Sequence, residues 1–135
     1  MEILEVATSQ RSEMVELTRQ VQRVAGAMQV VDGLIMVYVP HTTAGITINE
    51  NADPNVVYDV LAQLEAMVPW DQTFYRHGEG NSAAHVKASM MGSSVMVMVN
   101  AGRLVLGRWQ GIYLCEFDGP RTRQIHVQTD KMTGC

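Results

Sequence analysis

The chain has 135 residues, with 10 Lys and Arg against 14 Asp and Glu, which gives a formal net charge of −4. This length suits one domain with a hydrophobic core, spanning residues 1–135, and is short for two. Hydrophobic residues make up 47% of the chain, which argues against a disordered protein. The acidic balance argues against nucleic-acid binding, for which a basic face is usual.

Targeting and redox features indicate a cytoplasmic protein. No apolar run approaches the roughly 20 residues of a transmembrane helix, so no membrane partner is expected. The first residues, MEILEVATSQRSE, are acidic where a signal peptide is basic. The two cysteines, Cys115 and Cys135, are too few for a disulfide framework, which predicts a reduced, cytoplasmic chain.

The N-terminal part of the chain combines strand and helix patterns. Residues 2–7 alternate between apolar and polar side chains, which predicts a strand. Apolar side chains then recur at helical spacing over residues 13–28, at Met14, Leu17, Val21, Val24 and Met28. Ser12 is the expected N-cap of this helix, and a continuing strand is the weaker alternative. The apolar run at 34–39 predicts a strand that is covered on both faces.

A polar strand and two helices are predicted after Pro40. Residues 41–50 alternate, so one polar face would be shared by His41, Thr43, Thr47 and Asn49. Asp53-Pro54 predicts a helix start, and the apolar stripe of that helix is Val57, Val60, Leu61, Leu64 and Val68. A short helix at 82–91 would be capped by Asn81 or Ser82 and closed by Gly92.

The last third of the chain has the pattern of a sheet. Residues 95–99 and 103–106 flank Asn100-Ala101-Gly102, which predicts a hairpin. Residues 108–117 and 123–129 flank DGPRT, which predicts another turn. The expected fold class is therefore α+β, a single compact domain with a largely antiparallel β-sheet or sandwich and two to three helices. We expect most of the methionines to be adaptable core filler and not a binding surface.

The segment HTTAGITINENADP holds the first group of candidate functional residues beside a buried strand. Its polar members are His41, Thr42, Thr43, Asn49, Glu50, Asn51 and Asp53. A polar face that continues from an apolar strand favours a pocket lining. Thr and Asn also suit strand ends and turns, and Asp53 needs no role beyond capping its helix.

The segment RHGEGNSAAHVKAS holds the second group. Glu79 lies between two glycines, and His85 falls in the first turn of the short helix. The partial positive charge at a helix N-terminus favours a neutral imidazole and attracts anions, which suits phosphate binding, proton transfer or metal ligation. A histidine in solvent is the alternative. Ser89 shares the face of His85, whereas Lys87 lies nearly opposite and could join only around the helix end or in a neighbouring subunit.

The strand at 108–117 places Gln110 and Glu116 on a largely apolar face. Burial of an unpaired carboxylate is costly, so Glu116 is expected to pair with Arg123 across the DGPRT turn. A purely structural cross-strand ion pair is the alternative to a role in a site. Cys115 lies on the aromatic face and is expected to act as a small hydrophobe and not as a nucleophile.

A divalent metal, Mg or Zn, is a further possibility. His41, His85 and Glu116, with His77, Glu79 or Asp53 nearby, could form a His/carboxylate site. No tight spacing such as HExxH supports it, and the sequence has no P-loop or GxGxxG, so no organic cofactor is expected.

Three long segments together resemble the YjbQ-like family, also called the secondary thiamine-phosphate synthase family. They are HTTAGITINENADP, EGNSAAHVKASMMGSSV and GRLVLGRWQGIYLCEFDGPRTRQIHV, and the match covers almost the whole chain. The resemblance implies a small α+β protein that forms a homotrimer, with its polar motif residues in a cleft near subunit contacts. The loop between His77 and His85 is shorter than is usual in the family. Ala88 stands where a serine is common, and Arg108 where a threonine is common.

The resemblance also implies an activity and a set of site residues. The first hypothesis is a small enzyme acting on a phosphorylated or anionic metabolite. Thiamine-phosphate synthase activity would join a pyrimidine diphosphate to a thiazole phosphate and release pyrophosphate. Catalytic roles fall to His41, His85, Glu79 and Asp53. Substrate binding falls to Thr42, Thr43, Asn49, Glu50, Asn51, Lys87, Ser89, Gln110 and Arg123. The alternatives are a non-catalytic small-ligand binding or regulatory trimer and a divalent-metal hydrolase that uses the same pocket.

Overall fold

Eight strands form two antiparallel sheets in the computed structural model, which describes residues 1–130. The order in the five-stranded sheet is β1 (Glu2–Ala7), β8 (Thr122–Thr129), β3 (Gly33–Tyr38), β5 (Ser94–Asn100) and β6 (Arg103–Leu104). The order in the three-stranded sheet is β2 (Glu13–Glu16), β7 (Gln110–Glu116) and β4 (Ala44–Glu50). Three helices complete the fold, namely α1 (Thr18–Ala27), α2 (Pro54–Met67) and α3 (Ser82–Met91). The α+β class and the single compact domain are as predicted, whereas Cys135 lies outside the described residues.

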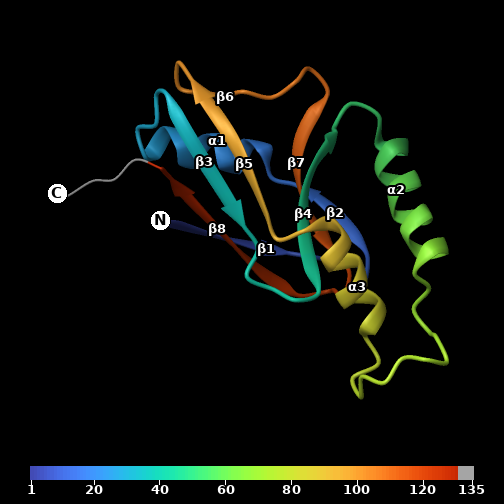
Figure 1. Cartoon of the computed structure of the whole chain (residues 1–135). Coiled ribbons are helices and arrows are strands. Elements are labelled where there is room, and N and C mark those ends of the chain that lie inside the picture. The colour runs from blue at the N-terminus through green and yellow to red at the C-terminus, as the bar shows by residue number, and fades with distance from the viewer. Residues whose placement is uncertain (131–135) are drawn as a thin grey trace.

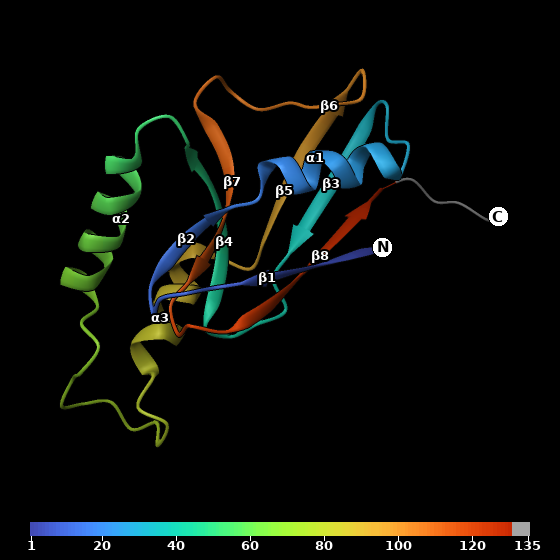
Figure 2. The ribbon, with the colours of Figure 1, turned by 180° about the vertical axis from the view of Figure 1, so that it is seen from behind.

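The three-stranded sheet lies between two hydrophobic clusters. The main core joins α1 and the inner faces of both sheets, with Ile35 and Val127 from one sheet and Ile46 and Leu114 from the other. The second cluster packs α2 and α3 against the opposite face of β7. Figures 1 and 2 show α2 and α3 beside the three-stranded sheet and away from β1, β3 and β8. Strand β7 is therefore buried on both faces after its first residue.

The predicted helix over 13–28 is wrong in its first turn, where the chain forms β2. This strand pairs with β7, so its side chains alternate between the two clusters. Met14 packs against the cluster of α2 and α3, whereas Val15 packs against the main core. Helix α1 begins only after this strand, and its N-cap is Leu17, not Ser12.

The outer face of β3 is open, which corrects two further predictions. The run at 34–39 was expected to be covered on both faces, but Met36 and Tyr38 are 41% and 42% exposed. On the neighbouring strand β5, Met96 and Met98 are also exposed. Several methionines thus lie on a surface and not in the core, because the run is covered on one side only.

The remaining helix and turn predictions are confirmed, with one difference in connection. The Asp53 carboxylate caps α2 by accepting the Asn55 N–H at 2.9 Å, and Pro54 is the first helical residue. Helix α3 begins after Asn81 and ends at Gly92. The DGPRT segment does not close a hairpin, because β7 and β8 belong to different sheets. No helix among residues 1–130 is long and apolar enough to cross a membrane.

Glycine at position 45 allows α3 to pack directly on β4, and this contact predicts a stability change. A Cβ at Gly45 would lie 2.8 Å from the Gly92 carbonyl oxygen and 2.8 Å from the Met91 Cβ. We expect Gly45→Ala to lower the free energy of unfolding by about 1–3 kcal/mol, because backbone cannot move aside cheaply. Urea unfolding measures this change.

The matched control is Gly26→Ala in α1, where a Cβ meets nothing within 4 Å. In a helix interior this change stabilises by about 0.5–1 kcal/mol. Equal urea midpoints for Gly45→Ala and the unmodified chain would contradict the close packing of α3 on β4.

Candidate functional site

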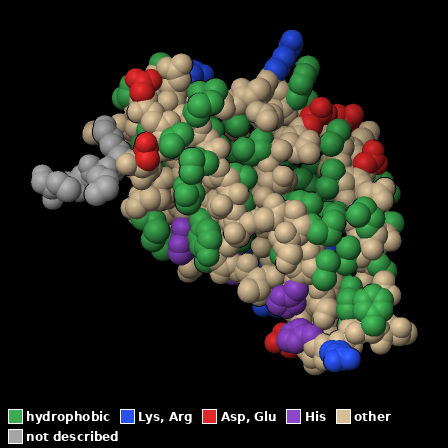
Figure 3. All heavy atoms as spheres, viewed as in Figure 1, with side chains coloured by type: hydrophobic (Ala, Val, Ile, Leu, Met, Phe, Trp, Pro, Cys, Tyr) green, Lys and Arg blue, Asp and Glu red, His purple; other side chains and the backbone are tan. Residues whose placement is uncertain are grey.

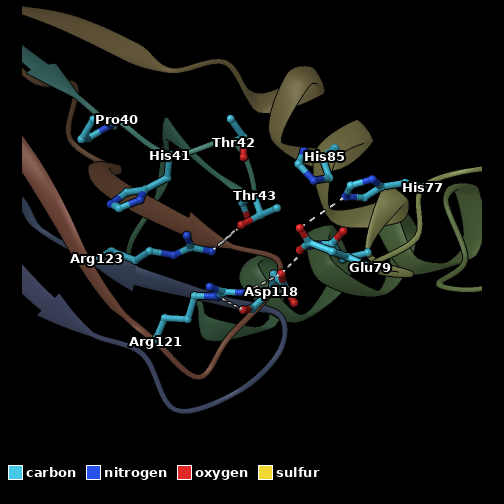
Figure 4. A pocket seen from close by; sticks show the side chains of 11 residues that line it. Pro40, His41, Thr42, Thr43, His77, Glu79, His85, Asp118, Arg121 and Arg123 are labelled. Atoms are coloured by element: carbon cyan, nitrogen blue, oxygen red, sulfur yellow. Dashed lines mark hydrogen bonds and ion pairs between the residues drawn. The ribbon is translucent and has the colours of Figure 1, made fainter.

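Two adjoining cavities lie between the chain leading into β4 and the start of α3, and Figure 4 shows the side chains that line the first of them. Their volumes are about 420 Å³ and about 530 Å³, and both are lined by His41, Thr42 and His85. The first is lined in addition by Pro40, Thr43, His77, Glu79, Asn81, Asp118, Arg121 and Arg123. The second extends along α3 past Ser89 to Gly92 and Ser93. The first is the more polar site, because it collects most of the ionisable side chains.

One wall of the first cavity is built on the buried ion pair of Glu116 and Arg123, which are 0% and 3% exposed. The Arg123 guanidinium donates from Nε to Glu116 Oε1 at 2.9 Å and from Nη2 to Oε2. The Thr8 hydroxyl and the backbone N–H groups of Phe117 and Asp118 also donate to this carboxylate. Burial alone raises the pKa of Glu116, but these hydrogen bonds outweigh burial and hold it below its ordinary value.

The same guanidinium fixes the loop that carries His41. Arg123 Nη2 donates to the Thr43 hydroxyl at 2.8 Å and to its carbonyl at 3.3 Å. His41 Nε2 accepts the backbone N–H of Gln124 at 2.9 Å. Burial and the nearby positive charge of Arg123 lower the pKa of His41. His41 is therefore a neutral imidazole held against β8.

The opposite wall carries a pair of histidines, His77 and His85. In Figure 4, His85 lies across the cavity from His41, beside His77 and Glu79. The rings of His77 and His85 meet edge to face with their centroids 5.4 Å apart. His77 Nε2 lies 3.9 Å from Glu79 Oε1. This wall thus offers imidazole nitrogens and a carboxylate, the groups used for proton transfer.

A polar chain closes the base of the cavity. Asn81, the N-cap of α3, donates from Nδ2 to Asp118 Oδ2 at 2.9 Å. Arg121 Nη2 pairs with the same oxygen at 2.9 Å, and its Nε donates to the Asp118 carbonyl. The hydrogen bonds of residues 1–130 leave Nη1 of Arg121 for a ligand. This base therefore adds a cation and a helix N-terminus to the cavity.

Part of the predicted site lies elsewhere in the fold. The structure brings His41, Thr42, Thr43, Glu79, His85 and Arg123 to the first cavity and Ser89 to the second. Of the remaining predicted residues, Lys87 lies on α3 and Glu116 ends β7 behind the cavity wall. The others are at the far end of β4 or just after it, namely Asn49, Glu50, Asn51, Asp53 and Gln110. The seven residues of β4 span roughly 20 Å at about 3.3 Å per residue.

The polar residues at the far end of β4 make hydrogen bonds within the protein. Asn51 donates to Glu16 Oε2 at 3.0 Å, and Gln110 accepts the Gly107 N–H at 2.8 Å. Asn49 accepts the N–H of Glu50 at 2.7 Å, and the Glu50 carbonyl accepts the Tyr113 hydroxyl. Asp53 caps α2. The predicted single polar face does not form, because His41 and Thr43 precede the strand, which begins at Ala44, and α3 packs on its second residue, Gly45.

Lys87 does not reach the cavities. Its side chain is 3% exposed, and its Nζ pairs with Glu65 Oε2 at 2.6 Å. This pair joins α3 to α2 and explains the position of Lys87 opposite His85 on the helix. Ser89 bonds to the His85 carbonyl within α3.

The predicted metal ligands do not fit a metal ion. His41, His85 and Glu116 do not converge, because the Glu116 carboxylate is enclosed by Arg123, Thr8 and two backbone N–H groups. In residues 1–130 no group of three or more His, Cys, Asp or Glu side chains is placed to hold an ion. Cys115 is buried, which raises its thiol pKa to about 12, so it is inert as expected.

Sequence reasoning did not include Asn81, Asp118 and Arg121 in the site. The available signal was the DGPRT turn itself, which holds an acid and a base three residues apart. Thr8, which donates to Glu116, had no signal beyond its place after the first strand.

The Glu116–Arg123 pair predicts an acid-dependent stability. Because the folded pKa of Glu116 is lowered, its contribution is present above the unfolded pKa near 4.3 and is lost as the pH falls through the folded value. We expect Glu116→Gln to cost about 3–5 kcal/mol at pH 7, since Arg123 is left buried without its partner. Urea unfolding between pH 7 and pH 3 should show the difference from the unmodified chain shrinking below about pH 4.

The control is Glu5→Gln, at an exposed carboxylate on β1, which should stay within about 0.5 kcal/mol. A difference between Glu116→Gln and the unmodified chain that does not change with pH would contradict a charged Glu116.

Comparison with known proteins assigns the family. The sequence pattern described as UPF0047 protein YjbQ-like matches residues 2–131. UPF0047 protein YugU of Bacillus subtilis is 50% identical over 125 residues, 93% of this chain and 95% of that protein. UPF0047 protein MJ1081 of Methanocaldococcus jannaschii is 45% identical, over 92% of this chain and 89% of that protein.

Solved structures of similar proteins support the same family assignment. A crystal structure of a yjbq/upf0047 family protein from Clostridium acetobutylicum matches with a TM-score of 0.93 at 46% identity. The match covers 96% of this chain and 99% of that chain. A conserved hypothetical protein of Thermus thermophilus, TT1486, matches with a TM-score of 0.88 at 42% identity, over 96% and 99% of the two chains. The chain therefore belongs to the UPF0047 YjbQ-like family.

Proposed function

We propose that this chain is a cytoplasmic enzyme that binds a small phosphorylated or otherwise anionic metabolite between His41 and His85. The observation that carries the proposal is the convergence of these two histidines, from separate elements, on cavities they both line. Such cavities with a few convergent polar groups are the usual form of a small-molecule site. The free thiol Cys115 fits a reducing compartment.

The charge arrangement supports an anionic ligand. Helix α3 directs its N-terminus and Asn81 toward the first cavity, where backbone N–H groups favour negative charge. Arg121 adds a half-exposed guanidinium at the base. Of the two carboxylates there, Asp118 is paired with Arg121, and Glu79 lies 3.9 Å from His77 Nε2. An anionic group of the ligand would therefore lie within reach of the start of α3 and of Arg121.

His85 is the proposed proton-transfer group. It lines both cavities and contacts the ring of His77, which in turn lies beside Glu79. His77 and Glu79 thus add two polar groups beside the His85 ring, on the wall where proton transfer is proposed.

Thiamine-phosphate synthase activity is one candidate reaction within this class, as the family resemblance implies. The thiazole phosphate would supply the attacking nitrogen, and pyrophosphate would leave from the pyrimidine. Arg121 and the start of α3 would counter the charge on the leaving group. The residues described here assemble no carboxylate cluster for a diphosphate-bound metal, so no step of the proposal depends on one.

A ligand screen tests the proposal. We expect phosphorylated or carboxylate metabolites to raise the Tm of the unmodified chain, and at least one such compound to be converted. The two thiamine precursors are the first pair to assay. His85→Ala should lower turnover about 10²-fold or more while the Tm shift with ligand persists.

The control variant is Arg103→Ala, an exposed residue on β6 outside both cavities, which should keep full turnover. The proposal would be abandoned if no phosphorylated or carboxylate compound shifted the Tm. Tight binding without turnover would instead favour the non-catalytic binding protein.

We also propose that the chain forms a homotrimer through the outer face of the five-stranded sheet. Met36, Met96 and Met98 are exposed side by side on β3 and β5, and Tyr38 packs against His126 on the same face. Figure 3 shows hydrophobic side chains gathered there. Contiguous exposed apolar surface of this kind indicates an interaction site. Further copies of this chain are the proposed partners.

Light scattering after size-exclusion chromatography tests the assembly. Met96→Glu places a charge in the proposed interface, so we expect the trimer to dissociate toward monomer. Met67→Glu, at an exposed methionine on α2, should leave the trimer intact. A monomeric unmodified chain would refute the trimer, and a trimeric Met96→Glu would refute this face.

A further inference from the structure

The hydrogen bond between His41 and β8 decides which nitrogen of this ring carries a proton. Nε2 of His41 accepts the backbone N–H of Gln124 at 2.9 Å. A backbone amide donates only, so the lone pair of Nε2 is occupied. The single proton of the neutral ring is therefore on Nδ1. His41 lines both cavities, and the hydrogen bonds of residues 1–130 leave this N–H without an acceptor.

Both partners in the hydrogen bond between His41 and Gln124 are held in place by neighbouring residues. Gln124 follows Arg123, whose guanidinium is held by Glu116. Thr43, two residues after His41, is held by the same guanidinium, and its carbonyl accepts the Phe117 N–H at 3.2 Å. Rotation of the imidazole would leave the Gln124 amide without its acceptor. The contacts of the folded chain therefore determine which ring nitrogen of His41 carries the proton.

The charges around His41 keep it neutral. Burial and the positive charge of Arg123 lower its pKa, and His126 acts in the same direction. The backbone hydrogen bond with Gln124 and the carboxylate of Glu116 raise the pKa of His41, but burial and Arg123 outweigh them. A neutral ring whose Nε2 is occupied has no lone pair to take a proton or to bind a metal ion.

We propose that His41 binds the ligand as a neutral Nδ1–H donor to an anionic oxygen, and that it is neither a general base nor a metal ligand. The donor role rests on the proposed anionic ligand, whereas the tautomer does not. Proton transfer is then left to His85, on the opposite wall. The ligand oxygen belongs to a phosphate or a carboxylate group, which share this hydrogen-bonding chemistry.

Nitrogen NMR of the ligand-free chain tests the tautomer directly. Long-range proton–nitrogen correlation on ¹⁵N-histidine protein distinguishes a ring protonated on Nδ1 from one protonated on Nε2. The His41 signals are assigned by their loss in His41→Asn. We expect the Nδ1–H tautomer at pH 7. A proton on Nε2, or on both nitrogens, would overturn the proposal.

Two matched variants test the donor role. The side-chain amide of Asn places an N–H near the position of Nδ1, whereas that of Gln places it near Nε2. We expect His41→Asn to bind inorganic phosphate or malonate nearly as well as the unmodified chain. His41→Gln should bind at least about 10-fold more weakly, the cost of a hydrogen bond to a charged group. The two probes separate a phosphate site from a carboxylate site.

The outcomes separate the two proposals. If His41→Gln bound the anion as well as the unmodified chain and His41→Asn lost binding, the proposal that Nδ1–H is the donor would be overturned. If the unmodified chain bound neither anion, the proposed anionic ligand would fail, and the donor role with it. The tautomer from NMR would still decide whether His41 can act as a base. Equal Tm values for both variants would show that the comparison is between folded proteins.

Discussion

The ion pair between Glu116 and Arg123 connects the parts of the molecule on which the candidate site depends. Glu116 ends β7 in one sheet, and Arg123 lies on β8 in the other. The same two side chains contact Thr8 after β1 and Thr43 before β4. One buried pair thus joins both sheets and fixes the loop that presents His41.

A buried pair of this kind is stabilising only when its remaining hydrogen-bonding groups are satisfied. Glu116 meets this condition, since two guanidinium nitrogens, a hydroxyl and two backbone N–H groups surround its carboxylate. The sequence left open whether Glu116 belongs to a structural ion pair or to the site, and the structure shows that it does both: it forms the pair, and the pair supports the cavity wall. Both side chains are buried and hydrogen-bonded within the protein, and one wall of the first cavity is built on them.

Residues that local patterns control were predictable, whereas those that depend on tertiary pairing were not. Asp53-Pro54 determines a helix start by local chemistry, and the structure shows it. The spacing from Met14 onward favours a helix over a strand, yet pairing with β7 makes Met14 and Val15 part of a strand. The pair of Glu116 and Arg123 was predicted, but its position between two sheets was not, because a turn sequence does not encode which sheet the next strand joins.

The motif residues of the family therefore fall into two groups, those that hold parts of the protein together and those that face the cavities. Lys87 joins α3 to α2, and Asn51 holds β4 to Glu16, so their contacts are with the protein itself. His41 and His85 instead face the cavities. The seven residues of β4 separate the contacts of Asn51 from the cavities that His41 and His85 line. A strand holds its two ends apart, so residues of one continuous sequence motif lie at two separate places in the fold. The cavities lined by His41 and His85 are at one of these places.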